Sequence, residues 1–199
     1  YQLFVRMFGT NNLPDCSNMC HESSGAALME SIGVGKGSVT LDDFDHADCI
    51  LIMGQNPGTN HPRMLSSLLK AAKNGCKIIS INPLKESGLS RFKHPQEVFT
   101  LLGHGTALAT HWLQVKINKD VALLKGLMKE LQRLDEEKKI FDHEFIKNYT
   151  HGFDEFIKDL KNTSCSKMVF ARSNIAILNV SAIIGLKIIS RDTAWREKR

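Results

Sequence analysis

Long apolar runs are missing from this sequence. No stretch of its 199 residues reaches the roughly 18 consecutive apolar residues that a membrane-spanning helix needs. The order of charged, apolar and small residues that marks a secretory signal peptide is also absent. We therefore predict no membrane segment. The sequence begins at Tyr1 without a Met, and we expect it to be an excised region or a truncated product of a longer protein.

Cysteine is scarce and odd in number, which argues against a disulfide scaffold. The five cysteines are Cys16, Cys20, Cys49, Cys76 and Cys165. The length and the 42% hydrophobic fraction suffice for an ordinary core, so disulfides are not needed. We predict a reducing compartment, the cytoplasm. Cys49 and Cys76 lie inside apolar runs, where a thiol is typical of a small core residue.

Most of the chain has no cluster of charges of one sign. The formal net charge is +5, and Lys and Arg are spread except at residues 138–139 and 196–199. A nucleic-acid-binding surface needs a basic cluster, so we predict no nucleic-acid partner. A pocket for an anionic, phosphate-bearing ligand accounts for the same balance.

The clearest pattern is an apolar run at residues 49–53, a turn-rich loop, and an amphipathic run at 63–74. A short apolar run bounded by turn residues is typical of a strand covered on both faces. Gly75 suits a helix end, and residues 77–81 form the next apolar run. Strand, helix and strand at this spacing predict a right-handed βαβ unit. We therefore predict an α/β fold, a three-layer sandwich with a mostly parallel sheet.

The rest of the chain predicts further elements of both kinds. Residues 1–8 have strand character, and residues 135–139 form a charge run that we expect to be solvated. The remaining predicted elements are helices at 26–32, 121–134, 142–149 and 153–160 and a strand at 112–117.

Polar residues follow the two strands of the βαβ unit. In open α/β sheets, ligands bind outside the carboxyl ends of the strands. Gly54 lets a backbone approach a ligand closely, and Asn56 offers both a donor and an acceptor. Asn82 and Asp120 end later strands and are expected to reach the same crevice. The alternative is that these are ordinary strand-to-helix turns.

Two other motifs carry possible chemistry. Cys20-His21 places a soft thiolate ligand or nucleophile beside a proton carrier. The alternative readings are a loop cysteine beside a surface histidine, or a zinc site shared with Cys16, for which no second cysteine pair exists. Residues 33–37, Gly-Val-Gly-Lys-Gly, match neither the P-loop nor the dinucleotide fingerprint, so we predict a flexible connection.

An ordered set of segments resembles the molybdopterin oxidoreductase superfamily, and in particular the formate dehydrogenase alpha-subunit-like proteins. The segments lie at residues 16–24, 54–62 (Gly-Gln-Asn-Pro-Gly-Thr-Asn-His-Pro), 78–83, 113–116, 120–124 and 145–153. They cover roughly the first four fifths of the chain. The set is specific because the segments occur in the same order, although each is weak alone.

The resemblance implies a bis(molybdopterin guanine dinucleotide) cofactor that holds molybdenum or tungsten. Cys20 and His21 match the family's cysteine–histidine pair at the metal, which implies that Cys20 is the metal ligand and that both residues are catalytic. The positions implied to hold one dinucleotide arm are Gly54, Gln55, Asn56, Pro57, Asn60, His61, Asn82, Pro83, Lys85 and Asp120. Asp120 matches a position that recognises guanine. Lys85 stands in for an arginine that relatives carry at the position of Leu84.

The resemblance also implies an organisation. We expect residues 1–160 to form the α/β domain, the first guanine-dinucleotide-binding region, and residues 161–199 to begin the next domain. A [4Fe–4S] cluster is expected only in a missing N-terminal region, because no four-cysteine cluster is present. The implied reaction is two-electron oxidation of formate or a similar small substrate, with an unknown electron acceptor. The rival hypotheses are a nucleotide-binding module without molybdenum and a non-catalytic fragment.

Overall fold

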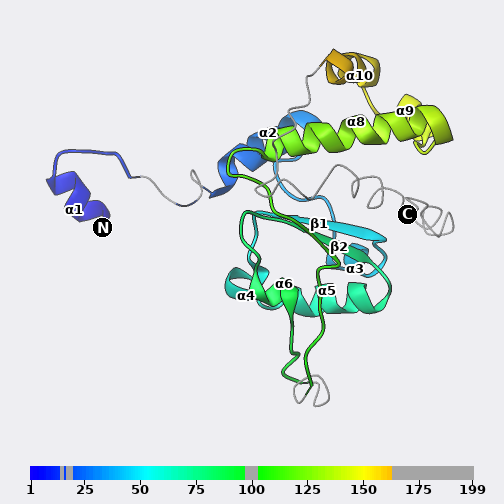
Figure 1. Cartoon of the computed structure of the whole chain (residues 1–199). Coiled ribbons are helices and arrows are strands. Elements are labelled where there is room, and N and C mark those ends of the chain that lie inside the picture. The colour runs from blue at the N-terminus through cyan, green and yellow to red at the C-terminus, as the bar shows by residue number, and fades with distance from the viewer. Residues whose placement is uncertain (14–15, 17–19, 97–102, 163–199) are drawn as a thin grey trace. The chain divides into compact units, whose positions relative to one another are not determined.

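The computed structural model describes residues 1–13, 16, 20–96 and 103–162. The chain divides into two compact units, Tyr1–Asp43 and Phe44–Arg199 (Figure 1). The predicted second domain, residues 161–199, falls almost wholly outside the described residues, so that division stays a prediction. Within the described part of the chain, no helix is long and apolar enough to cross a membrane.

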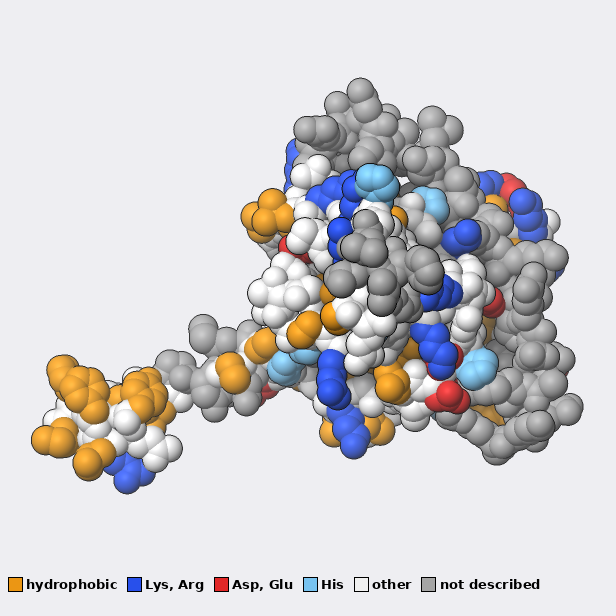
Figure 2. Space-filling view, turned by 90° about the horizontal axis from the view of Figure 1, so that it is seen from below, with side chains coloured by type: hydrophobic (Ala, Val, Ile, Leu, Met, Phe, Trp, Pro, Cys, Tyr) orange, Lys and Arg blue, Asp and Glu red, His pale blue; other side chains and the backbone are white. Residues whose placement is uncertain are grey.

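The first unit is helical, and one of our predictions for it is wrong. Residues 1–8, expected to be a strand, contain helix α1 (Gln2–Met7). An unpaired strand leaves its backbone groups without partners, whereas the helix bonds Val5 N–H to the Tyr1 carbonyl oxygen at 3.0 Å. Only Val5 of α1 is buried, and Figure 2 shows its other apolar side chains gathered on the surface.

Helix α2 (Glu22–Ile32) begins earlier than predicted, with His21 as its N-cap residue. Gly33 ends it in the left-handed conformation, at φ +73°. Helix α3 (Leu41–Asp45) follows, and the Thr40 backbone N–H donates to the Asp43 carboxylate at 2.6 Å. The Asp43 side chain thereby satisfies a backbone N–H at the start of the helix.

The second unit contains a parallel three-stranded sheet in the order β1-β2-β3. Strands β1 (Cys49–Met53) and β2 (Lys77–Ile81) have the predicted bounds. Strand β3 (His111–Leu113) is shorter than the predicted strand at 112–117 and begins one residue earlier. Ile50 is in register with Ile78, and Ile81 is in register with Leu113. The α/β class and the parallel sheet are confirmed.

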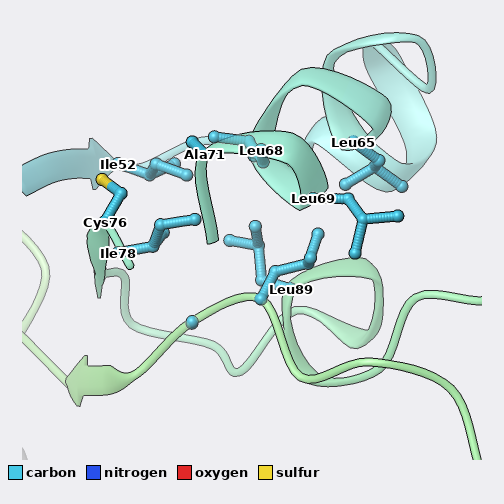
Figure 3. Packing of buried hydrophobic residues seen from close by; sticks show 10 residues of the cluster. Ile52, Leu65, Leu68, Leu69, Ala71, Cys76, Ile78 and Leu89 are labelled. Carbon is cyan, nitrogen blue, oxygen red and sulfur yellow. The ribbon is translucent and has the colours of Figure 1, made fainter. Parts of the chain in front are cut away.

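Helices cover both faces of the sheet. On one face, α5 (Met64–Lys73) packs Leu65, Leu68 and Leu69 against Ile52 and Ile78, and Figure 3 shows these side chains together. The short helices α4 (Pro57–Asn60) and α6 (Ser87–Ser90) lie beside α5 on this side of the sheet. On the other face, Leu123 of α8 (Asp120–Lys138) packs against β2 and β3. The three-layer arrangement is therefore present.

Strand β1 differs from the prediction in its burial. The apolar run predicts cover on both faces, yet Leu51 is 51% exposed while Ile52 is 3% exposed. The reason is that β1 lies at the end of the strand order and α8 covers β2 and β3. Of the β1 residues, only Met53 packs against the cluster under α8. The central strand β2, by contrast, is buried from Ile78 to Ile81.

The charge run after the predicted helix is also not simply solvated. Helix α8 continues through it to Lys138, and Lys139 closes the helix in the left-handed conformation. Asp135 is buried and accepts the Phe141 backbone N–H at 2.8 Å, with His143 Nε2 3.0 Å from its other oxygen. Helices α9 (His143–Tyr149) and α10 (Phe153–Asn162) then follow.

Candidate functional site

The carboxyl end of β1 leads into a loop with open backbone. Gly54 has φ +63°, a conformation that favours glycine, and its N–H donates to the Ile81 carbonyl oxygen at 2.9 Å. Apart from Gly54 and its two chain neighbours, the described residues place no heavy atom within 4 Å of where a Cβ on Gly54 would be. The backbone here is tied to β2 and still leaves space beside it.

Asn56 shapes the rest of this loop. Its side-chain oxygen accepts the Thr59 backbone N–H at 3.1 Å, which caps α4. Pro57 occupies the first helical position, where its missing N–H costs nothing and its fixed φ suits the helix. Asparagine followed by proline is therefore the local signal that starts α4 directly after β1.

The carboxyl end of β2 forms a matching loop. Asn82 continues the sheet by donating its N–H to the Leu113 carbonyl oxygen at 3.1 Å. Its side-chain oxygen accepts the Leu84 N–H at 3.3 Å. Gln114, just after β3, donates to the Pro83 carbonyl oxygen at 2.9 Å. This loop is held on both sides, by its own asparagine and by the neighbouring strand end.

A residue that the sequence reasoning missed joins the two loops. The Glu86 carboxylate accepts from Asn56 Nδ2 at 2.6 Å and from Asn82 Nδ2 at 3.3 Å. Glu86 is half-buried. No local motif marks it, because its partners are 30 and 4 residues away in sequence. In the sequence, Glu86 could have been found only by noting that a carboxylate follows the same predicted sheet edge as the amides of Asn56 and Asn82.

Two glycines bring the helices after these loops into contact. A Cβ on Gly88 would lie 3.0 Å from the Gly58 Cα, and a Cβ on Gly58 would lie 3.2 Å from the Gly88 Cα. Either distance is shorter than ordinary contacts allow. Glycine at both positions therefore lets α4 and α6 pack backbone to backbone, which places the two strand-end loops side by side.

The remaining predicted residues of the loops are more exposed. Gln55 Nε2 lies 3.5 Å from His61 Nδ1, while Asn60 is exposed at the end of α4. The Lys85 ammonium lies over the Trp112 ring, 5.2 Å from its centre. Lys85 therefore bridges the β2 loop to β3 by a cation–π contact.

Asp120 lies farther along the chain after β3. It is half-buried and is the first residue of α8, with Lys119 rather than Asp120 in the N-cap position. The turn before it places Asn118 at φ +64°, a conformation that asparagine tolerates better than most residues. The chain therefore turns at Asn118 and enters α8 at Asp120.

The pair Cys20-His21 belongs to the first unit, which is described by itself. Cys20 Sγ lies 3.4 Å from His21 Nε2, and both residues are exposed at the start of α2. The thiol and the imidazole are close enough to exchange a proton. Among the described residues, no group of three or more His, Cys, Asp or Glu side chains is placed to hold a metal ion. The zinc alternative with Cys16 thus gains no further ligands there.

Of the two cysteines predicted to be small core residues, Cys76 is buried but Cys49 is exposed, so the prediction is wrong for Cys49, which begins the outer strand β1. Cys76 is buried, and burial, reinforced by the charges of Cys49 and Asp48, raises the pKa of its thiol to about 11. Burial together with the Asp48 charge also raises the pKa of Cys49. Thiols with raised pKa values are poor nucleophiles and poor metal ligands at neutral pH. Cys20 is the candidate for reactive chemistry because its exposed thiol lies 3.4 Å from the His21 imidazole.

Comparison with known proteins identifies the family to which this chain is similar. The family profile described as molybdopterin oxidoreductase matches residues 1–192. An uncharacterised oxidoreductase of Mycobacterium tuberculosis is 58% identical over 158 residues, which is 78% of this chain and 20% of that protein. Formate dehydrogenase H of Escherichia coli is 28% identical over 158 residues, which is 79% of this chain and 19% of that protein.

A solved structure agrees on the fold. Acetylene hydratase from Pelobacter acetylenicus superposes with a TM-score of 0.54 at 22% identity, over 80% of this chain and 19% of that one. The chain spans about a fifth of the length of the curated relatives that it matches. The likeness to this structure concerns the arrangement of helices and strands alone.

Proposed function

Because this chain belongs to the molybdopterin oxidoreductase family, we propose that it holds one guanine dinucleotide arm of a molybdopterin cofactor and supplies a thiolate to the metal. One observation carries the binding part of the proposal. The loops after β1 and β2 meet at the carboxyl edge of a parallel sheet, where Asn56 and Asn82 share one carboxylate.

The donor set of the loops fits such an arm. The space beside Gly54 admits a ligand against the backbone, and Gln55, Asn60 and His61 offer exposed or half-exposed polar groups. Pro57 and Pro83 set the direction in which each loop leaves its strand. Lys85 adds positive charge at the same edge, and Asp120 offers a carboxylate for the paired N–H groups of guanine.

The thiol of Cys20 fits a metal whose other ligands come from the cofactor. The described residues contain no cluster able to hold a metal by themselves, so a single protein thiolate suffices only if the cofactor supplies the remaining ligands. When bound, the cofactor accepts two electrons from the substrate. In this proposal Cys20 ligates the metal, and His21, 3.4 Å away, takes up or releases the proton.

The proposed reaction of the whole enzyme is two-electron oxidation of formate or a similar small substrate. It is supported by the likeness to formate dehydrogenase H. The exposed thiols Cys16 and Cys20 suit the reducing cytoplasm. A [4Fe–4S] cluster and an electron acceptor are proposed for the whole enzyme, and no residue of this chain is assigned to either.

The reaction is tested with the native protein that contains this chain, purified without oxygen. We expect formate to reduce a viologen dye, one electron per dye molecule and two dye molecules per formate. A panel of other small oxidisable substrates is run beside formate. If none of them reduces the dye although the protein contains molybdenum or tungsten, the proposed reaction is wrong.

A nucleotide-binding module without metal is the second candidate, since the loops that meet at the sheet edge are joined without a metal. It predicts that the 199-residue chain binds a simple guanine nucleotide. Titration calorimetry with GMP and with AMP separates the two candidates. Guanine-selective binding by a native protein that lacks pterin favours the module, whereas pterin in the native protein favours the molybdoenzyme.

A further inference from the structure

The carboxylate of Glu86 lies between the two loops that the proposed function assigns to the cofactor. One of its oxygens accepts from Asn56 Nδ2 at 2.6 Å and the other accepts from Asn82 Nδ2 at 3.3 Å. Hydrogen bonds to an ionised group are stronger than those between neutral groups. A single side chain thus connects the end of β1 to the end of β2.

The orientation of both amides is determined by the backbone. The Asn56 side-chain oxygen must face the Thr59 N–H at 3.1 Å, and the Asn82 side-chain oxygen must face the Leu84 N–H at 3.3 Å. An N–H donor needs an oxygen, so each NH₂ group is directed away from its own loop. Glu86 receives both NH₂ groups, and neither amide can turn over without losing two hydrogen bonds.

The backbone of Glu86 is anchored as well. Its carbonyl oxygen accepts the Ser90 N–H at 3.1 Å and the Ser90 hydroxyl at 3.1 Å. Glu86 is the N-cap residue of α6, whose Gly88 touches Gly58 of α4. The Glu86 backbone is therefore fixed, and the length of the Glu86 side chain sets the distance between the two loops that its carboxylate joins.

We infer that Glu86 is a positioning residue that holds the two strand-end loops at the one spacing that accepts the dinucleotide arm. The inference rests on the proposed function. Glu86 acts through the amides of Asn56 and Asn82 and does not touch the cofactor phosphates, because its negative charge would repel them. The loops are thereby set before the arm binds, which lowers the ordering cost of binding.

A pair of substitutions with exchanged groups tests this role. Glu86→Gln keeps the shape but directs an NH₂ group at one of the two asparagines, which leaves two donors facing each other. Asn56→Asp alone places a second carboxylate against Glu86. In the double variant E86Q/N56D, the new amide at position 86 donates to the new carboxylate at position 56. The Thr59 N–H keeps its acceptor there, and the bond from Asn82 is retained.

The probe is the cofactor content of the native protein, measured per folded molecule as fluorescent oxidised pterin and as GMP released by hydrolysis. Folded protein is quantified separately by thermal melting. For E86Q we expect pterin and GMP to fall by about tenfold, which corresponds to about 1.4 kcal/mol of lost binding free energy. Asn56 is itself proposed to hold the arm, so the double variant is read by its thermal midpoint. In E86Q/N56D we expect the midpoint that E86Q lowers to return to near the wild-type value, because the two loops are joined again.

Each outcome decides the matter. Loss of pterin and GMP in E86Q, together with recovery of the thermal midpoint in the double variant, supports the positioning role, since a general loss of stability is removed by counting folded protein only. Unchanged pterin and GMP in E86Q overturn it, and so does a lowered midpoint that the double variant fails to restore. If the wild-type protein itself holds no pterin, the proposed function fails instead, which is a distinct result.

Discussion

The two regions that carry the proposed chemistry are stabilised in opposite ways. Among the described residues of the unit Tyr1–Asp43, Val5 is the one buried apolar side chain, and α2 buries no residue. The proposed reactive pair in this unit is Cys20 and His21, whose Sγ and Nε2 atoms lie 3.4 Å apart. In the second unit, the ligand-binding loops follow buried strands and are joined by Glu86 and by the contact of two glycines.

This difference in burial between the two units matches two different requirements of the proposed function. A metal ligand and a proton carrier need access, and Cys20 and His21 are exposed. A binding crevice needs fixed geometry, which a packed sheet supplies better than an isolated helix. We therefore expect substitutions in the first region to change reactivity with little effect on stability, and substitutions in the second to change stability and cofactor binding together.

The largest expected effect comes from the first region. Cys20→Ala in the native protein removes the proposed metal ligand, so turnover should fall by at least about a hundredfold, since even groups behind the ligands change metal sites by about 10–100-fold. Cys20 is exposed, so the unfolding midpoint should hardly move. Cys16→Ala, which removes another exposed thiol, is the matched control and should keep its activity. Equal activity in both variants contradicts the assignment of Cys20.

The core of the second region gives the largest expected change in stability. Leu68 is fully buried between α5 and the sheet, so Leu68→Ala should lower the free energy of unfolding by about 2–5 kcal/mol. Met29→Ala in α2 is the comparison, because Met29 is 56% exposed; its change should stay within about 0.5 kcal/mol. Urea unfolding of the 199-residue chain, followed by circular dichroism, measures both. Similar losses of unfolding free energy in the two variants would contradict the proposed difference in stability between the two regions.

The glycine contact supplies an intermediate effect. Gly88→Ala places a methyl group 3.0 Å from the Gly58 Cα, and overpacking of this kind costs about 1–3 kcal/mol. The control is Gly37→Ala, where no heavy atom lies within 4 Å of the added Cβ. The same urea experiment compares them. If Gly88→Ala is as harmless as Gly37→Ala, α4 and α6 are not held in contact.

Some of the structural features behind these predictions could be predicted from the sequence, and others could not. The bounds of β1 and β2 were predicted correctly because apolar runs between turn residues are local signals. Residues 1–8 were mispredicted, because a strand needs a partner that local sequence does not reveal. The exposure of Leu51 likewise depends on which strands α8 covers.

The geometry of the candidate site was predictable to a similar extent. Gly54, Asn56 and Asn82 were predicted to follow strand ends, and the structure places them there and brings Asn56 and Asn82 together through Glu86. Glu86 was missed because its bond to Asn56 spans 30 residues. The burial of Asp135 was missed for a different reason: its partners Phe141 and His143 are near in sequence, but a run of charged residues is usually solvated.

The smallest expected effect is a pH dependence. The pKa of the Cys76 thiol is raised from 9.0 to about 11 by burial, so the unfolded chain releases this proton first as the pH rises. The stabilising contribution is complete below pH 9 and is lost between about pH 9 and 11. Cys76→Ala should flatten the fall in unfolding free energy over this interval by about 1–2 kcal/mol. Parallel curves for the two proteins would show that Cys76 does not titrate in this way.

The most direct test of the account is a combined analysis of the native protein that contains this chain, purified without oxygen. Molybdenum and tungsten are measured by mass spectrometry of the elements, and pterin and GMP are measured in the same sample. We predict near-stoichiometric molybdenum or tungsten with pterin and GMP in constant proportion to it. A folded native protein with neither metal nor pterin would contradict the account and leave the sheet edge at Gly54 without the proposed cofactor.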